Sequence, residues 1–411
     1  MTPPVTERRA FARRRTALAL MVALSLAACG SDDDDDDGAP ASDEAGGPAP
    51  DADGLVTLDI DATAGGFGTE PDDPADRWAY LDLDTGRTLD IDDAAADAST
   101  EWDIAFKRVD VRLNGGASGP GEAVGGIVDA QLELYDEEGE PDVDAFLEAT
   151  AEGEREAIAR AVDPVSIEYV DDAPVAAILG DGVDTGASWW IYDPANRAIS
   201  ANPSVRYAVR GADGESYAKA RVTDIQQAER QVTVELELQP AGGDAFDVPA
   251  TWVATIGPEG GASCYYFATM GEVDCEANAA TWDLQAEITP DGRAWHLWTN
   301  GGTRGEGGSG ASFGPLDAAT AASFATGDDV PVWTEDSAGG VFEEYPWYAY
   351  SLRDENRIWP NFRVYAIDTG ESAFKLQVLR YYDEAGTSGM IRVRFAPLDG
   401  AGAGGEAGAG S

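Results

Sequence analysis

The stretch Trp102–Gly116, "WDIAFKRVDVRLNGG", returns in altered form over Trp282–Gly302 as "WDLQAEITPDGRAWHLWTNGG". Both versions open on Trp-Asp and end on Asn-Gly-Gly. Counted back from the shared Asn-Gly-Gly, Asp110 of the first version stands where the second has His296, the only histidine of the chain. The sequence therefore raises two questions: why it repeats itself, and whether the histidine carries chemistry.

The repeat extends well beyond this opening phrase. The segment Trp189–Val222 is echoed by Pro346–Val378, with paired aromatic residues, an Asn-Arg, a Tyr-Ala and an identical Gly-Glu-Ser in the same order. Lys219 and Lys375 occupy equivalent places after Gly-Glu-Ser. Because order and approximate spacing both hold, the pattern indicates an internal repeat. It predicts two tandem modules, 54–240 and 241–399, each long enough to bury a core of its own.

Strand signals dominate both modules. Gln231–Gln239, "QVTVELELQ", and Met390–Phe395, "MIRVRF", alternate apolar and polar residues with the period of a half-buried strand. Turns containing Gly and Asp separate such runs, which favours an all-β fold with minor helix. The best helix candidate is Asp142–Val162, flanked by prolines, and a shorter one begins at Leu316.

The two ends of the chain predict export rather than fold. Arginines precede a short apolar run that ends in "LAAC", which is typical of a secretory signal over residues 1–28 and resembles a bacterial lipobox. That resemblance implies lipidation of Cys29. The composition of residues 29–53 predicts an acidic disordered tether, and that of residues 400–411 predicts a disordered tail. Gly30 is not the aspartate of an inner-membrane retention signal, so we expect a lipid-anchored protein of the bacterial cell envelope, at the outer membrane.

Charge excludes some partners. With 27 Lys and Arg against 77 Asp and Glu, the formal net charge is −50, which excludes nucleic acid and leaves the lipid anchor as the only contact with a membrane. The acidic pair Asp82 and Asp84 fits no EF-hand spacing, so no metal site is assigned, although weak calcium binding stays open. Cys264 and Cys275 bracket a predicted hairpin, and in an exported protein they predict a disulfide.

The quoted motifs, "WDIAFKRVDVRLNGGASG" from Trp102 and "YAVRGADGESYAKARV" from Tyr207, resemble the HmuY family of exported haem-binding lipoproteins. The echoes in the second half resemble a second HmuY-type module. The resemblance implies an all-β fold with a cleft that holds haem between two axial side chains. It also implies haem acquisition through an outer-membrane receptor.

The family's axial ligands, a pair of histidines or a pair of methionines, are only partly matched here. Module 54–240 has no His, Met or Cys, which leaves its tyrosines or Lys107 as ligands. Module 241–399 offers His296, Met270 and Met390 as candidate haem ligands. Strand alternation places His296 and Trp298 on one face, so an axial imidazole could have an aromatic wall. In the alternative interpretation, His296 is a lone surface or half-buried residue that needs no function, and Met390 packs in the core.

No catalytic pattern is evident. No nucleophile motif lies near His296, and neither a P-loop nor an HExxH motif occurs, so we do not expect an enzyme. Two hypotheses remain. The first is a cell-envelope lipoprotein that binds haem or another small apolar ligand of porphyrin type. The second is a duplicated β-module with a structural role, or with a non-haem ligand, at the cell surface.

Overall fold

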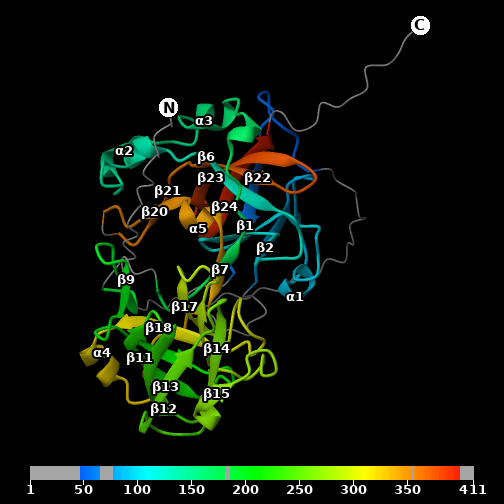
Figure 1. Cartoon of the computed structure of the whole chain (residues 1–411). Coiled ribbons are helices and arrows are strands. Elements are labelled where there is room, and N and C mark those ends of the chain that lie inside the picture. The colour runs from blue at the N-terminus through cyan, green and yellow to red at the C-terminus, as the bar shows by residue number, and fades with distance from the viewer. Residues whose placement is uncertain (1–46, 65–76, 181–185, 354, 399–411) are drawn as a thin grey trace, which may run out of the picture.

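The computed structural model describes residues 47–64, 77–180, 186–353 and 355–398. The predicted signal peptide, Cys29, most of the tether and the tail 400–411 lie outside these residues. The described chain forms two lobes, each built from a five-stranded and a four-stranded antiparallel sheet (Figure 1).

In the first lobe, the five-stranded sheet has the order β1 (Val56–Asp61), β24 (Ser388–Pro397), β23 (Ala373–Tyr382), β22 (Val364–Asp368) and β6 (Val124–Asp129). Its partner has the order β3 (Arg87–Leu89), β2 (Ala79–Asp82), β4 (Ile104–Lys107) and β5 (Asp110–Leu113). Buried residues from both sheets, among them Phe106, Tyr365 and Val393, form one core between them.

In the second lobe, the five-stranded sheet has the order β13 (Val248–Thr255), β12 (Gln231–Gln239), β11 (Tyr217–Gln226), β10 (Arg206–Arg210) and β18 (Ala311–Leu316). Its partner has the order β15 (Gly271–Val273), β14 (Gly261–Tyr266), β16 (Leu284–Ile288) and β17 (Trp295–Thr299). Trp252, Leu284 and Leu297 are among the residues that pack between these sheets.

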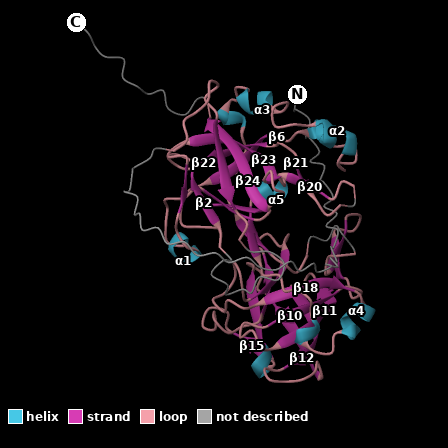
Figure 2. Ribbon diagram, turned by 180° about the vertical axis from the view of Figure 1, so that it is seen from behind, coloured by secondary structure: helices cyan, strands magenta, loops and turns pink. Residues whose placement is uncertain are grey.

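Three small ribbons and a few short helices complete the described structure. The ribbons are β8 (Trp190–Asp193) with β9 (Ala198–Ala201), β20 (Tyr348–Tyr350) with β21 (Ile358–Pro360), and β7 (Ala173–Val175) with β19 (Ser337–Gly339). The α-helices are α1 (Asp93–Ala96), α2 (Val143–Glu148), α3 (Arg155–Ala159), α4 (Ala318–Ser323) and α5 (Val341–Glu344). The 3-10 turns are Leu132–Leu134, Pro164–Ser166, Phe267–Thr269 and Gly327–Asp329. Strands dominate the molecule and all the helices are short (Figure 2), which confirms the predicted all-β class with minor helix.

The predicted helix Asp142–Val162 is instead two short helices, α2 and α3. Asp142 caps α2 as expected, since its side chain accepts hydrogen bonds from the backbone amides of Asp144 and Ala145. The helix is interrupted near Gly153, whose amide donates to the hydroxyl of Thr150. Such a local side-chain bond competes with the helical ladder, and glycine adds little to hold the helix together.

The lobes do not follow the predicted modules, and this is the main correction to the sequence analysis. The predicted boundary at residue 240 falls between β12 and β13, which are neighbours in one sheet. At the other end, β1 of the first repeat pairs with β24 of the second, with Ile60 opposite Ile391. In Figure 1, blue and cyan strands therefore share a lobe with orange and red ones, while green and yellow strands share the other.

The repeat itself is visible in the topology, because both lobes have the same strand order. Matching the two orders makes β1–β6 equivalent to β13–β18, and β22–β24 equivalent to β10–β12. We call β1–β6 and β13–β18 the front halves of the two repeats, and β8–β12 and β20–β24 the back halves. Each front half packs with the back half of the other repeat. The halves are exchanged within one chain, as elements are exchanged between subunits in domain swapping.

The crossing points of this exchange pair with each other. The chain leaves the first lobe through β7 and returns through β19, and these two segments form an antiparallel ribbon with Ala338 opposite Pro174. The lobes differ from the predicted modules because both repeats carry the same apolar and turn pattern. The sequence pattern of a front half is therefore compatible with either back half. Only the course of the connecting segments decides which back half it pairs with.

The two repeated lysines hold the exchanged halves together. Lys219 donates to the backbone carbonyl of Phe324, the residue that ends α4. Lys375 donates to the carbonyl of Arg160, the residue that ends α3. A cation at a helix C-terminus satisfies an orphan carbonyl and opposes the negative end of the helix dipole. In both lobes the lysine comes from one repeat and the helix from the other.

Candidate ligand-binding site

His296 lies on the outer face of β17, where its ring packs against Trp298 with 5.0 Å between ring centroids. It stands opposite Glu287 of β16. Burial is the largest influence on its pKa and lowers it; Glu287 raises it and Arg304 lowers it further. The imidazole is therefore held in the neutral form, which is the form that ligates metals.

The residues around His296 form a compact polar and aromatic cluster that the sequence did not reveal. The indole nitrogen of Trp298 donates to Glu287 Oε2 at 2.7 Å, and the guanidinium of Arg304 donates to the same oxygen at 3.0 Å. The Arg304 guanidinium also lies 4.4 Å from the centre of the Trp298 ring. These contacts fix the Trp298 ring beside His296. The spacing of Glu287 and Arg304 in the sequence gave no signal that they would meet there.

The structure does not bring the three candidate haem ligands together. Met270 follows the end of β14 and is 54% exposed, whereas Glu287, the partner of His296, lies beside Ala262 near the start of that strand. Met390 lies in the other lobe, half-buried on β24 opposite Asp61. Among the described residues, neither methionine therefore lies where it could bind the same metal atom as His296.

The hairpin that carries Met270 is cross-linked. Cys264 and Cys275 form a disulfide, with their Cα atoms 5.3 Å apart. Met270 adopts a left-handed conformation with φ of 50° at the end of a 3-10 turn. The disulfide and the tight turn thus present the thioether to solvent on a braced loop.

The equivalent position in the first lobe has different chemistry. Asp110 pairs with Lys107 across β4 and β5, as His296 pairs with Glu287. The nearby Tyr348 has its pKa raised to about 12, chiefly by burial and further by the charges of Asp110 and Glu343. A tyrosine ligates haem iron as the phenolate, which this raised pKa disfavours. At this position lobe 1 therefore has a carboxylate where lobe 2 has an imidazole.

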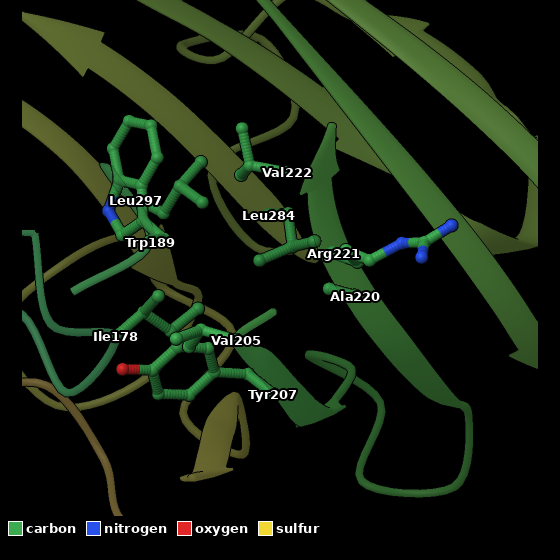
Figure 3. A pocket seen from close by; sticks show the side chains of 9 residues that line it. All are labelled: Ile178, Trp189, Val205, Tyr207, Ala220, Arg221, Val222, Leu284 and Leu297. Atoms are coloured by element: carbon green, nitrogen blue, oxygen red, sulfur yellow. The ribbon is translucent and has the colours of Figure 1, made fainter. Parts of the chain in front are cut away.

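Two hollows of the described structure do not have His296 in their lining. A void of about 10 Å³ lies in the core of lobe 2 among side chains that include Trp189, Tyr207 and Leu297 (Figure 3); it can hold one water at most. A larger cavity of about 370 Å³ lies where the chain crosses between the lobes. Its lining comes from the crossing segments and β18: Val175, Ala176, Ala177, Leu179, Ser312, Gly314, Pro315, Thr334, Glu335 and Ser337. This size falls within the range of small-molecule sites.

The motif residues that recur in the sequence are structural. Asn300 is fully buried, donates to the carbonyls of Trp282 and Ala279, and accepts from the amide of Gly307. Asn114 makes the matching bonds to Trp102, Ser99 and Gly121 in the first lobe. The Trp-Asp and Asn-Gly-Gly motifs therefore close loops rather than reach a ligand.

The last glycine of Asn-Gly-Gly is required by close backbone packing. Gly302 has a φ of 64°, and a Cβ there would lie 1.7 Å from the carbonyl oxygen of Asp336. Gly116 has a φ of 58°, and its Cβ would lie 2.2 Å from the carbonyl oxygen of Asp172. No other residue fits either position. Asp336 and Asp172 thus anchor equivalent turns in the two lobes.

Buried aspartates give the protein an unusual dependence of stability on pH. Burial raises the pKa of Asp103 and of Asp283 to about 7, and that of Asp336 to about 6. A carboxyl whose folded-state pKa lies above its unfolded value binds its proton more tightly when folded, so stability falls as pH rises between the two values. From about pH 5 to about pH 8 we expect the thermal midpoint to fall by about 5 °C.

A variant of one of these residues checks this prediction. Asp103→Asn keeps an oxygen to accept the bond that Leu83 donates to the side chain, and it removes the titrating group. Thermal unfolding at a series of pH values should show a shallower slope for the variant than for the wild type. A wild-type midpoint that rises across this range would contradict the prediction.

None of the helices in the described part of the chain is long and apolar enough to cross a membrane.

Comparison with known proteins gives a family for part of the chain. Residues 75–239 match the family model described as HmuY protein. This family is one of binding proteins rather than enzymes. The match covers β2–β12, which is the front half of the first repeat without β1 together with its back half, and these two halves belong to different lobes. A search of curated proteins found no match.

Two solved structures resemble the chain at low identity. One, from Bacteroides fragilis, is described as a candidate lipoprotein; it is 10% identical, with 85% of this chain and 94% of that chain covered and a TM-score of 0.29. The other, from Bacteroides vulgatus, is described as a candidate HmuY-like haem-binding protein; it is 11% identical, with 86% and 97% covered and a TM-score of 0.28. The assignment of residues 75–239 therefore depends on the family match.

Proposed function

We propose that this protein is a HmuY-type lipoprotein of the cell envelope that binds haem or a related porphyrin and hands it to an outer-membrane receptor. The observation that carries the proposal is the match of residues 75–239 to the HmuY family model. In this proposal the second repeat is a further HmuY-like module, which its identical strand order supports. Attachment would be through a lipid on Cys29.

In this proposal the haem site lies at His296 on the outer face of β17. A neutral, half-buried imidazole could hold the iron of haem, and the indole ring beside it would stack on the porphyrin. Neither Met270 nor Met390 lies near His296. We therefore propose ligation from one side by this chain, and Arg304 beside Trp298 would supply a cation for a porphyrin carboxylate.

Titration with haemin tests this proposal. We expect the mature, unlipidated protein to give a saturable, shifted Soret band, and His296→Ala to lose it because the iron loses its only protein nitrogen. Met270→Ala should leave the band unchanged and serves as the matched control. A band that survives in His296→Ala would move the site to a tyrosine or a methionine. Absence of a saturable shift in the wild type would overturn haem binding.

The second candidate function is a duplicated β-module that binds a different small ligand or acts structurally. The cavity of about 370 Å³ at the lobe crossing favours it, because its size suits a small molecule and its lining does not include His296. Its lining is part apolar and part polar, with Glu335 as its one carboxylate, so it would suit a small amphipathic molecule. Failure of the haemin titration would leave this function as the better one.

A further inference from the structure

β13 is an edge strand of lobe 2 whose outer side is open. It stands first in the order of its sheet, with β12 as its neighbour. The amide of Ile256 donates to the carbonyl of Arg230, and the residues of an antiparallel strand alternate between facing the partner strand and facing away. The backbone groups of Thr251, Val253 and Thr255 therefore face away from β12. Among the described residues, these groups form no backbone hydrogen bond with another segment.

Lobe 1 carries charge at the equivalent edge. The amide of Ala62 donates across its strand pair as that of Ile256 does in lobe 2, so β1 and β13 are in the same register. The outward positions of β1 are therefore Thr57, Asp59 and Asp61, and all three residues are exposed. Charged side chains on an edge strand oppose its pairing with a further strand. The edge of lobe 1 is thus protected.

β13 lacks this protection. Its sequence, "VPATWVAT", contains no charged residue, in a chain with a formal net charge of −50. Where lobe 1 has Asp59 and Asp61, lobe 2 has Val253 and Thr255, and Val253 is 47% exposed. Valine and threonine both favour strands. The two lobes share one strand order but differ at this edge, and the difference permits β13 to pair with a further strand.

We propose that β13 pairs with β13 of a second copy of this chain, antiparallel about a two-fold axis at Val253. Two-fold dimers are the commonest soluble homo-oligomers, and an antiparallel pair of identical strands has this symmetry. In this register Val253 lies opposite Val253 and Thr251 opposite Thr255, so no charges meet within the strands. Three outward-facing residues in each copy would form about six backbone hydrogen bonds. The two five-stranded sheets would become one continuous sheet.

The carboxylates nearest to this edge are held within their own lobe or lie beyond the strand. Glu235 on β12 is paired with Arg221, and Glu272 on β15 accepts hydrogen bonds from two side chains of lobe 2. Asp247 and Glu259 lie outside the two ends of β13, so acidic residues of the two copies would approach each other only there. β13 lies at the end of lobe 2 that is remote from lobe 1 (Figure 1), so a second copy can approach it without meeting lobe 1.

A second copy fits this edge better than a strand of another protein. A foreign strand could add to the edge in the same way, but two copies of β13 match residue for residue about Val253, with threonine opposite threonine. A contact along one strand is small compared with the interface of a permanent dimer. We therefore expect a weak, reversible dimer with a Kd in about the micromolar range. This assembly is independent of haem binding.

Sedimentation equilibrium of the mature, unlipidated chain tests the proposal. Between about 1 μM and about 1 mM the wild type should pass from monomer to dimer. Val253→Asp should raise the Kd of the dimer at least about tenfold, because it places two carboxylates opposite each other at the axis. Thr57→Asp is the matched control. It adds the same charge to the equivalent edge of lobe 1, at the position that corresponds to Thr251, and should leave the Kd unchanged.

A cysteine at position 253 tests the register. Opposite residues of a hydrogen-bonded antiparallel pair have Cα atoms about 5.5 Å apart, which a disulfide can span. In a chain with Cys29 replaced by Ser, Val253→Cys should give disulfide-linked dimers on oxidation, and Thr57→Cys should not. A wild type that stays monomeric throughout would overturn the proposal. So would a dimer that survives Val253→Asp, one that Thr57→Asp weakens equally, or a Val253→Cys chain that stays unlinked.

Discussion

A cysteine pair at positions 61 and 390 is expected to form a disulfide spontaneously in the folded protein. Asp61 stands opposite Met390 in the pairing of β1 with β24. The amide of Ala62 donates to the carbonyl of Gly389, so the adjacent pair occupies a non-hydrogen-bonded position, where Cα atoms lie about 4.5 Å apart. That separation is within the range that a disulfide spans.

The matched control is a cysteine pair at positions 61 and 231. In lobe 2, β13 pairs with β12 as β1 pairs with β24, and Thr255 stands opposite Gln231. If each repeat folded on its own, β1 would pair with β12 and bring Asp61 opposite Gln231. The exchanged fold places these two residues in different lobes. We therefore expect Asp61→Cys with Met390→Cys to cross-link, and Asp61→Cys with Gln231→Cys to stay reduced.

Peptide mapping without reductant would identify which cysteines are linked. Cys29 is replaced by Ser in both variants so that it cannot take part. The native bond between Cys264 and Cys275 serves as an internal standard for oxidation. Linkage of 61 to 231 in a monomeric chain would mean that the halves are not exchanged. Linkage of 61 to 390 would show that each lobe is made from both repeats.

Replacement of Asn300 by Ala is expected to lower stability by about 3–4 kcal/mol, because it removes a fully buried side chain and its three hydrogen bonds to the backbone. For a lobe of this size the thermal midpoint should fall by about 10 °C. Asn114→Ala should cost a similar amount in lobe 1, since its three bonds are equivalent. Differential scanning calorimetry would measure both.

An exposed asparagine from another part of the repeat provides the comparison. The amide of Asn196 donates only to Asp193, on the surface, so Asn196→Ala should cost about 0.5 kcal/mol or less. If Asn300→Ala lowered stability as little as Asn196→Ala, the Asn-Gly-Gly motif would not have a structural role in closing the loop. Asn300→Asp should also lower stability, because it replaces the amide nitrogen that donates to two carbonyls by an oxygen that faces them.

Several features of the protein followed from sequence alone because they depend on local pattern. The alternation in "QVTVELELQ" became β12, with Val232, Val234, Leu236 and Leu238 buried. The all-β class rested on many such runs, so errors in single elements did not affect it. The helix at Asp142–Val162 was overestimated, because the Thr150–Gly153 bond that interrupts it depends on backbone geometry.

The sequence also showed the repeat, yet it could not divide the repeat into lobes. The apolar alternation of β1 indicates that β1 needs a partner strand, but β12 and β24 have the same alternation and either could be that partner. Which of them pairs with β1 depends on where the crossing segments β7 and β19 run, a long-range property without a local signal. The match of residues 75–239 to one family model likewise follows the sequence repeat and not the lobes.

The candidate site shows the same division between sequence and structure. The sequence identified His296 as the one histidine and placed Trp298 on its face, which the strand geometry of β17 bears out. It could not show that Met270 lies at the far end of the sheet or that Met390 lies in the other lobe, because spacing along a chain does not fix distances across sheets. Local periodicity determined the strands of this protein, and the pairing of distant strands decided which side chains meet.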